Sequence, residues 1–204
     1  MRHSIKLLAS AALLAVGSSQ LQAASFVYTA ALSGAAEIPA NASAGTGFAT
    51  ITIDDALSTM HIQLTFSGLS GSTSAAHIHA ATAAPNSGTA GVATTTPTFA
   101  GFPLGVSAGA YDHTLDLTQT LSYNPAYLTA NGGTTQAAGT ALFAAMAAGK
   151  SYFNIHTTSF PGGEIRGFLN AALVPEPAIW AMMICGFAFA GAAMRRRKPI
   201  PSFA

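Results

Sequence analysis

The stretch from Tyr152 to Gly167, YFNIHTTSFPGGEIRG, constrains the fold of this chain more than any other. Its first six residues alternate polar and apolar side chains, which is typical of a half-buried β-strand. Pro161, Gly162 and Gly163 then predict a turn, because proline fixes φ at a first corner and glycine takes positive φ without steric cost. The chain returns through residues 164–170. The stretch therefore predicts a β-hairpin that buries Phe153, Ile155, Ile165 and Leu169.

Two charged residues, Glu164 and Arg166, share one face of the predicted return strand. We expect them to form an ion pair that fixes the hairpin register, since charge pairing is common in sheets. A carboxylate beside a histidine would also suit acid–base chemistry. However, no serine or cysteine nucleophile stands in a recognisable setting, and no glycine-rich phosphate loop follows a strand. We therefore do not expect the chain to be an enzyme.

The hairpin and the upstream segment Ala76–His79, AHIH, together resemble the CHRD domain, a module named after chordin that also occurs in many bacterial secreted proteins. In that family an AHIH segment precedes an NIHT…PGGEIRG segment, which here corresponds to Asn154–Gly167. The resemblance covers about residues 26–173, and we assign the domain to residues 25–173. It implies a fold rather than a specific activity.

The rest of the domain is dominated by apolar–polar alternation with a period of two, which predicts strands. No βαβ pattern is present. We expect an all-β fold, an antiparallel β-sandwich that is immunoglobulin-like or superoxide-dismutase-like, with one short helix. The expected strands are residues 26–32, 49–54, 60–66 and 74–80, several short strands between 92 and 117, and the hairpin; the expected helix is 136–148.

Three histidines are candidate metal ligands. His77 and His79 are two residues apart on a predicted strand, so both side chains leave the same face. His156, from the second family motif, offers a third imidazole, and three imidazoles with an open position suit Cu or Zn. The alternative is that these side chains only join the hydrogen-bond network of the sheet. His61 is expected on a solvated face, and His113 is expected to be partly buried.

The histidine pair is similar to the HxH copper ligands of Cu/Zn superoxide dismutase, which is also a β-sandwich. The similarity ends there, because that enzyme needs more histidines and an aspartate around a shared metal site. No cofactor is therefore assigned with certainty, and Cu or Zn is the candidate.

The N-terminus has the anatomy of a signal peptide over residues 1–24. Arg2 and Lys6 form a basic region, Leu7–Val16 is a short apolar region, and small residues at Ala23 and Ala24 permit cleavage. The alternative is an uncleaved anchor. We therefore expect the protein to be exported across the inner membrane.

The C-terminal residues 174–204 resemble the PEP-CTERM sorting signal. Pro175, Glu176 and Pro177 precede an apolar run, residues 178–194, which a cluster of arginines and a lysine follows. We expect this run to form a transmembrane helix with its basic end in the cytoplasm. The resemblance implies an exosortase-type membrane protease as partner, and a location first at the inner membrane and then at the cell surface or outside the cell. The alternative is a plain tail anchor.

The charge of the secreted part differs from that of the whole chain. Between residues 25 and 174, two cations face six carboxylates, a net charge of −4, whereas the whole chain carries a formal +1. A nucleic-acid partner is therefore not expected. The single cysteine, Cys185, lies in the tail, so the domain has no disulfide and depends on its core.

These observations favour an exported protein with a structural or adhesive role in the cell envelope or extracellular matrix. The alternative is a small metal-binding (Cu or Zn) or redox protein that uses His77, His79 and His156. A third interpretation is a binding module for a peptide or a sugar, such as a matrix polysaccharide.

Overall fold

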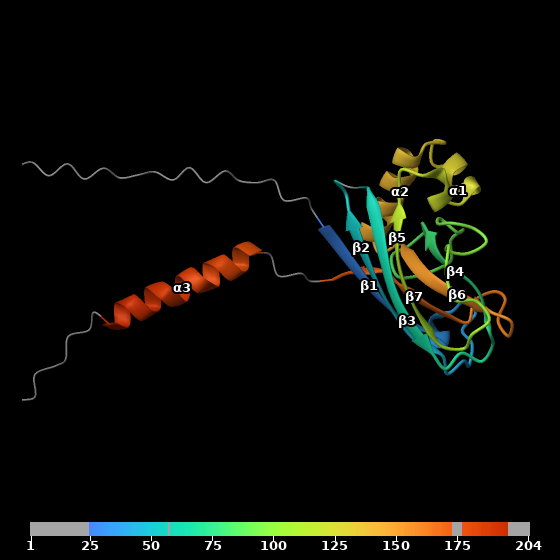
Figure 1. Cartoon of the computed structure of the whole chain (residues 1–204), viewed down its shortest axis with the longest axis horizontal. Coiled ribbons are helices and arrows are strands. Elements are labelled where there is room, and N and C mark those ends of the chain that lie inside the picture. Colours follow the sequence, from blue (N-terminus) through green and yellow to red (C-terminus); the bar gives the residue numbers. More distant parts are fainter. Residues whose placement is uncertain (1–24, 57, 173–176, 196–204) are drawn as a thin grey trace, which may run out of the picture.

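A computed structural model describes residues 25–56, 58–172 and 177–195 (Figure 1). Its strands form one antiparallel sheet in the order β4-β6-β7-β1-β2-β3-β5, with β8 paired to β1. The strands are β1 (Ser25–Ser33), β2 (Thr46–Asp54), β3 (Thr59–Ser67), β4 (Thr73–Ala80), β5 (Gly109–Asp116), β6 (Ser151–Thr157), β7 (Ile165–Phe168) and β8 (Asn170–Ala171). The helices are η1 (Gly34–Ala36), η2 (Thr120–Ser122), α1 (Pro125–Ala130), α2 (Thr135–Ala147) and α3 (Pro177–Arg195).

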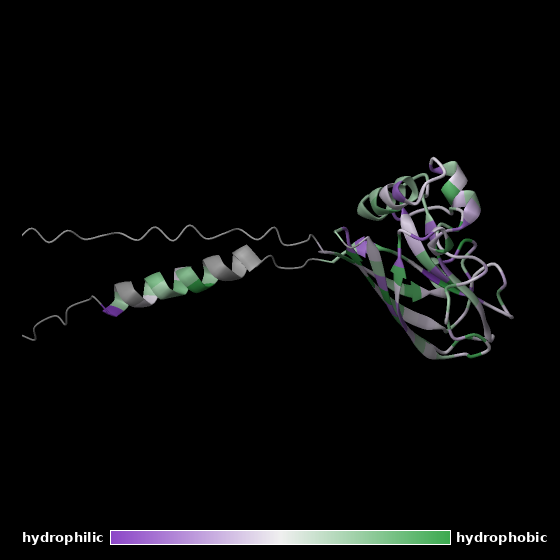
Figure 2. Ribbon diagram, turned by 45° about the horizontal axis from the view of Figure 1, so that its top comes forward, coloured by the Kyte–Doolittle hydropathy of each residue, from purple (hydrophilic) through white to green (hydrophobic). Residues whose placement is uncertain are grey.

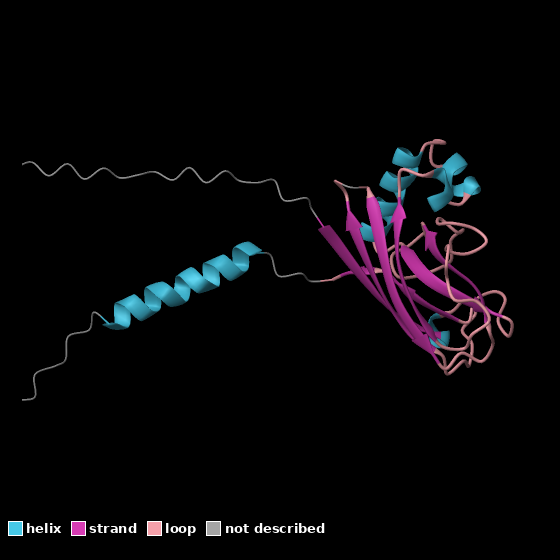
Figure 3. Cartoon of the chain, in the orientation of Figure 1, coloured by secondary structure: helices cyan, strands magenta, loops and turns pink. Residues whose placement is uncertain are grey.

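The sheet is curled into a half-barrel rather than divided into two layers (Figures 1 and 3). The prediction of an all-β, antiparallel fold is confirmed, but the prediction of a sandwich is wrong. The reason lies in β1, which pairs with β2 along nine residues and also joins β7 and β8. This strand connects the two halves of the sheet that a sandwich would separate.

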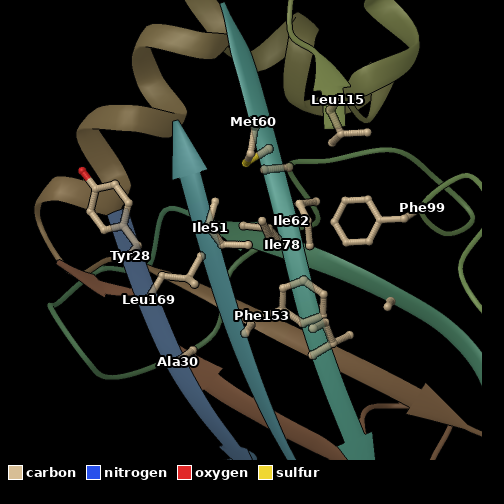
Figure 4. Close-up of a cluster of buried hydrophobic side chains, with 14 of the residues drawn as sticks. Tyr28, Ala30, Ile51, Met60, Ile62, Ile78, Phe99, Leu115, Phe153 and Leu169 are labelled. Carbon is tan, nitrogen blue, oxygen red and sulfur yellow. The ribbon is translucent and has the colours of Figure 1, made fainter. Parts of the chain in front are cut away.

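The core lies on the concave side of the sheet, where alternate residues of the strands meet (Figure 4). Ile51, Ile62, Ile78 and Phe153 have no exposed surface, and Ile53 has only 1%. Apolar and polar residues alternate along the strands (Figure 2), as expected for a sheet with one buried face. The predicted buried residues of the hairpin, Phe153, Ile155, Ile165 and Leu169, are confirmed.

The connection from β4 to β5 covers the open side of the curl. Its Phe99 stacks on Tyr111 of β5, with ring centroids 6.0 Å apart, and on Phe153 of β6 at 5.7 Å. A single aromatic side chain thus contacts β5, at one edge of the sheet, and β6, the second strand from the other edge. The several strands expected between residues 92 and 117 are reduced to β5 in the described chain, with isolated bridges at Val92 and Thr94.

Helices α1 and α2 lie together at one end of the sheet (Figure 3). The predicted helix 136–148 is confirmed as α2, whose N-terminus is capped by Thr134 accepting from the Ala137 amide. The sequence analysis missed α1, although Asn124 followed by Pro125 is a good start signal for a helix. The Asn124 side chain caps α1 by accepting from the Ala126 amide.

Helix α3 occupies the region where a transmembrane helix, residues 178–194, was expected. Its coloured residues are mostly hydrophobic (Figure 2). Among the described residues, however, no helix combines the length and the apolar character that a membrane crossing requires. The structure therefore gives this expectation no support.

Candidate functional site

The three candidate ligands come from the paired strands β4 and β6. In the register of this pair Ala75 lies opposite His156, His77 opposite Asn154, and His79 opposite Tyr152. The residues between them, Ile78 and Ile155, are fully buried in the core. Because side chains alternate along a strand, the imidazoles emerge from the other side of the sheet.

The three imidazoles gather into a cluster, which we call the histidine cluster. The ring centroids of His77 and His156 are 5.2 Å apart, those of His77 and His79 5.8 Å, and those of His79 and His156 6.2 Å. One nitrogen from each ring lies within 4.8 Å of the other two. His77 and His79 are buried and His156 is half-buried. The structure thus brings together all three histidines that the sequence analysis grouped.

Each ring of the histidine cluster is held by a backbone carbonyl from a covering loop. His77 Nε2 lies 2.6 Å from the Pro97 oxygen, His79 Nδ1 2.9 Å from the Ala90 oxygen, and His156 Nδ1 2.9 Å from the Pro161 oxygen. A carbonyl oxygen only accepts, so each of these nitrogens must carry the proton. Each ring keeps one buried acceptor that has no hydrogen-bond partner among the described residues: His77 Nδ1, His79 Nε2 and His156 Nε2.

Burial lowers the pKa of all three imidazoles. Desolvation is the largest cause in each case, and it outweighs the hydrogen bond that each ring donates. The pKa of His79 falls to about 4, helped by the nearby His77, His156 and Arg166. The histidine cluster is therefore neutral at pH 7, the form in which imidazole binds a metal.

Tyr152 holds His79 in place. Its ring stacks on the imidazole with centroids 4.6 Å apart and planes 8° from parallel. The Tyr152 hydroxyl accepts a hydrogen bond from the Ala90 amide and donates one to the Ala90 oxygen. His79 Nδ1 donates to the same oxygen. The Arg166 guanidinium lies over the Tyr152 ring, 4.7 Å from its centroid, which is close enough for a cation–π contact. These contacts fix the ring that presents Nε2 to the cluster.

Arg166 does not pair with Glu164, so the expected ion pair within the hairpin is wrong. The Arg166 side chain donates to the carbonyl oxygens of Ala36 and Gly88, and its Nε lies 3.7 Å from Glu37 Oε2. Both charged side chains are almost completely buried. Burial raises the pKa of Glu37 to about 7 although Arg166 opposes the shift. The partner of Arg166 is thus a carboxylate from the loop after η1, far away in sequence.

Glu164 instead holds two loops, one before β2 and one after β3, against the hairpin. Its carboxylate accepts from Thr157 Oγ1 and Ser43 Oγ, each at 2.6 Å, and from the backbone amides of Ser70 and Gly71. The residue is fully buried. Burial would raise its pKa, but these hydrogen bonds outweigh burial and lower it. The acidic residue of the PGGEIRG motif is therefore a structural anchor.

The turn of residues 161–163 contacts both the histidine cluster and Glu37. Pro161 supplies the carbonyl that holds His156. Gly163 has φ +132°, and a Cβ at this position would lie 2.7 Å from Glu37 Oε1. At Gly162, no atom of the described residues would lie within 4 Å of an added Cβ. The second glycine of the turn is thus required by conformation and by close packing, whereas the first is required by neither.

The other histidines lie outside the cluster. His61 is half-buried on the outer face of β3 and lies 2.6 Å from Asp112. His113 is exposed, so the expectation of partial burial is wrong. Of the predicted sorting residues, Pro175 and Glu176 lie outside the described residues, and Pro177 begins α3.

Sequence reasoning missed Glu37 as a neighbour of the site. Asn154 and Tyr152 alternate with the core residues of β6, so their shared face with His156 was readable. No local sequence pattern predicts that Glu37 lies near the site, because its position depends on how the loop after η1 folds over the sheet. In the part of the chain that the structure describes, Glu37 Oε1 and Asn154 Oδ1 are buried and have no hydrogen-bond partner.

Comparison with known proteins identifies the family. The sequence pattern described as the CHRD domain matches residues 28–169, which include the histidine cluster and the β6–β7 hairpin. No curated protein and no solved structure gives a significant match. The chain belongs to the CHRD domain family.

Proposed function

We propose that this CHRD-domain protein binds one Zn or Cu ion between His77, His79 and His156. Two observations carry the proposal: one nitrogen from each ring lies within 4.8 Å of the other two, and within the described chain each ring keeps one buried nitrogen without a hydrogen-bond partner. A buried acceptor without a partner is unfavourable, and a metal ion satisfies three of them at once.

The chemistry of the donors favours Zn or Cu. Neutral imidazole nitrogens suit both metals, and each ring already donates its other N–H to a carbonyl, the usual arrangement around metal-binding histidines. Zn–N bonds are about 2.0–2.1 Å long, so binding would draw the three nitrogens closer together. Three protein ligands leave a position for water or another small ligand.

Elemental analysis of the purified full-length protein tests this function. After dialysis against metal-free buffer, we expect about one Zn or Cu per chain in the wild type, because the three histidines supply the number of protein ligands found in open Zn sites. The matched control is His61→Ala, which removes a histidine outside the cluster and should leave the metal content unchanged. Metal-free protein, or metal retained by a His77→Ala/His79→Ala variant, would contradict the proposal.

The setting of this function is proposed from the two ends of the chain. A signal peptide over residues 1–24 would export the protein, and the tail from Pro175 would be recognised by an exosortase-type membrane protease. The domain would then act in the cell envelope or extracellular matrix, where a structural or adhesive role remains the second candidate function. The β6–β7 hairpin, which Glu164 connects by hydrogen bonds to two loops, favours a stable module of this kind.

Processing of the tail is tested separately from metal binding. With an epitope tag inside the domain, cell fractionation should show release of the wild type and retention of a Glu176→Ala variant at the membrane. Glu37→Gln, which leaves the tail intact, is the control and should be released. Equal release of the Glu176→Ala variant would exclude the sorting role of the Pro-Glu-Pro triplet and would leave the metal proposal unaffected.

A further inference from the structure

A second site lies between α2 and the turn that follows β2. Two adjoining hollows, with volumes of about 370 and 440 Å³, share Asp55, Thr140 and Phe143 in their walls. Together they form one groove, which we call the α2 groove. No residue of the histidine cluster lines it. Each hollow alone, and the two together, have a volume within the range for small-molecule sites.

The two halves of the α2 groove differ in chemistry. Hydroxyl and amide groups of Ser58, Thr118 and Gln136 line one half. Apolar and aromatic side chains, Phe26 and Tyr28 among them, line the other. Phe143 stands between the halves, and 49% of the Phe26 surface is exposed. A ligand for this groove must therefore offer many hydroxyl groups and also apolar C–H surfaces.

The charge of the α2 groove excludes anionic ligands. Asp55 is exposed where the halves meet, and the structure gives its carboxylate no hydrogen bond or ion pair within the described chain. No Lys or Arg among the described residues lines either half. A carboxylate offers two oxygens that accept from neighbouring hydroxyl groups. Phosphates and uronic acids would meet repulsion here, whereas neutral hydroxyl groups would meet an acceptor.

The position of the α2 groove also disfavours an extended peptide. The strands beside it, β1 and β2, are central strands that pair with neighbours on both sides. A peptide that adds to a sheet needs a free edge, and this region has none. Side-chain groups must therefore provide recognition.

We propose that the α2 groove binds a neutral saccharide. Hydroxyl groups of the sugar donate to Asp55 and exchange hydrogen bonds with Gln136 and Thr140, while the C–H face of a sugar ring packs on Phe143. The negative face of an aromatic ring attracts such C–H groups. This assigns a place in the fold to the sugar-binding interpretation of the sequence, and it is independent of the metal site.

Saturation-transfer NMR on the purified full-length protein tests the inference. The probes are cellohexaose and chitohexaose, which are neutral, an oligogalacturonate of the same length, and a cationic peptide of alternating Lys and Leu. We expect transfer to ring C–H protons of at least one neutral hexasaccharide and none to the other two probes. Transfer to neither neutral hexasaccharide, or to the uronate or the peptide instead, would overturn the proposal.

Exposed positions supply the variants, so loss of folding does not confuse the result. Asp55→Ala and Gln136→Ala should each weaken binding, the former about tenfold because a charged acceptor is lost. Asp112→Ala removes an exposed carboxylate on β5, outside the groove, and should bind like the wild type. Binding that is unchanged in the Asp55→Ala/Gln136→Ala double variant would place the saccharide elsewhere and overturn the assignment.

Discussion

Arg166 Nε lies 3.7 Å from Glu37 Oε2 in a part of the molecule where both side chains are almost fully buried. This pair lies beside the histidine cluster, because Arg166 also packs on Tyr152, which stacks on His79. Burial raises the pKa of Glu37 to about 7 despite the arginine. The carboxyl group of Glu37 thus changes its charge near neutral pH.

The first prediction concerns the pH dependence of stability. The pKa of Glu37 is raised in the folded state, so its contribution is fully present below the unfolded value of 4.5 and is lost as the pH rises through about 7. Between pH 4.5 and pH 8 the wild type should therefore lose on the order of 2 kcal/mol that a Glu37→Gln variant does not lose. Urea unfolding of both proteins at several pH values measures this difference. Parallel pH profiles would show that the pKa of Glu37 is the same in the folded and unfolded states.

The second prediction concerns Glu164. Replacing it by alanine removes a buried acceptor and leaves the Thr157 hydroxyl and the amides of Ser70 and Gly71 without their partner. The free energy of unfolding should fall by about 3 kcal/mol or more, since hydrogen bonds to a buried charge are strong. Asp116→Ala is the control, because Asp116 accepts from Thr118 and Gln119 at the exposed surface. Thermal melts in which the two variants lose the same stability would refute the anchoring role.

The third prediction separates the two glycines of the turn. Gly163→Ala should destabilise the fold by about 1–3 kcal/mol, because φ is positive and the new Cβ would meet Glu37 and Asn154. Gly162→Ala should change the free energy of unfolding by less than about 0.5 kcal/mol, since its Cβ would meet open space. Denaturant titrations of the two variants under one condition give the comparison. Similar losses in both would mean that the turn is sensitive to any side chain.

Much of the fold was readable from local patterns. Alternation with a period of two located β2, β3 and β6, and it placed Phe153 and Ile155 in the core. The HxH spacing predicted that His77 and His79 share a face, because a strand fixes that relation without help from the rest of the chain.

The parts that failed depend on contacts between distant segments. Local charge patterning paired Arg166 with Glu164, whereas burial selects Glu37, which a loop brings over the sheet. Alternation predicts a buried face but not which strands become neighbours, so the half-barrel was taken for a sandwich. Phe99 stacks on both Tyr111 and Phe153 and so links the two sides of the curled sheet. No short-range sequence pattern predicts this contact.

The pH dependence of metal binding follows from the lowered pKa values of the histidine cluster. Protons compete with a metal for the same nitrogens, but burial lowers the pKa of all three imidazoles below the usual value of 6.5, and that of His79 to about 4. The dissociation constant for Zn should therefore change little between pH 7.5 and pH 6.5, and it should rise steeply only at lower pH. Affinity that declines steadily from pH 7.5 would indicate imidazoles with ordinary pKa values, exposed to water.

Calorimetric titration of the metal-free full-length protein with Zn²⁺ and Cu²⁺ tests the central claim most directly. We predict one ion per chain for the wild type and for the His61→Ala control, and a loss of affinity of about a hundredfold or more in His77→Ala/His79→Ala, which keeps only one ligand. Absence of binding in the wild type, or equal binding in the double variant, would contradict the claim. The three imidazoles would then serve only the hydrogen bonds to Pro97, Ala90 and Pro161.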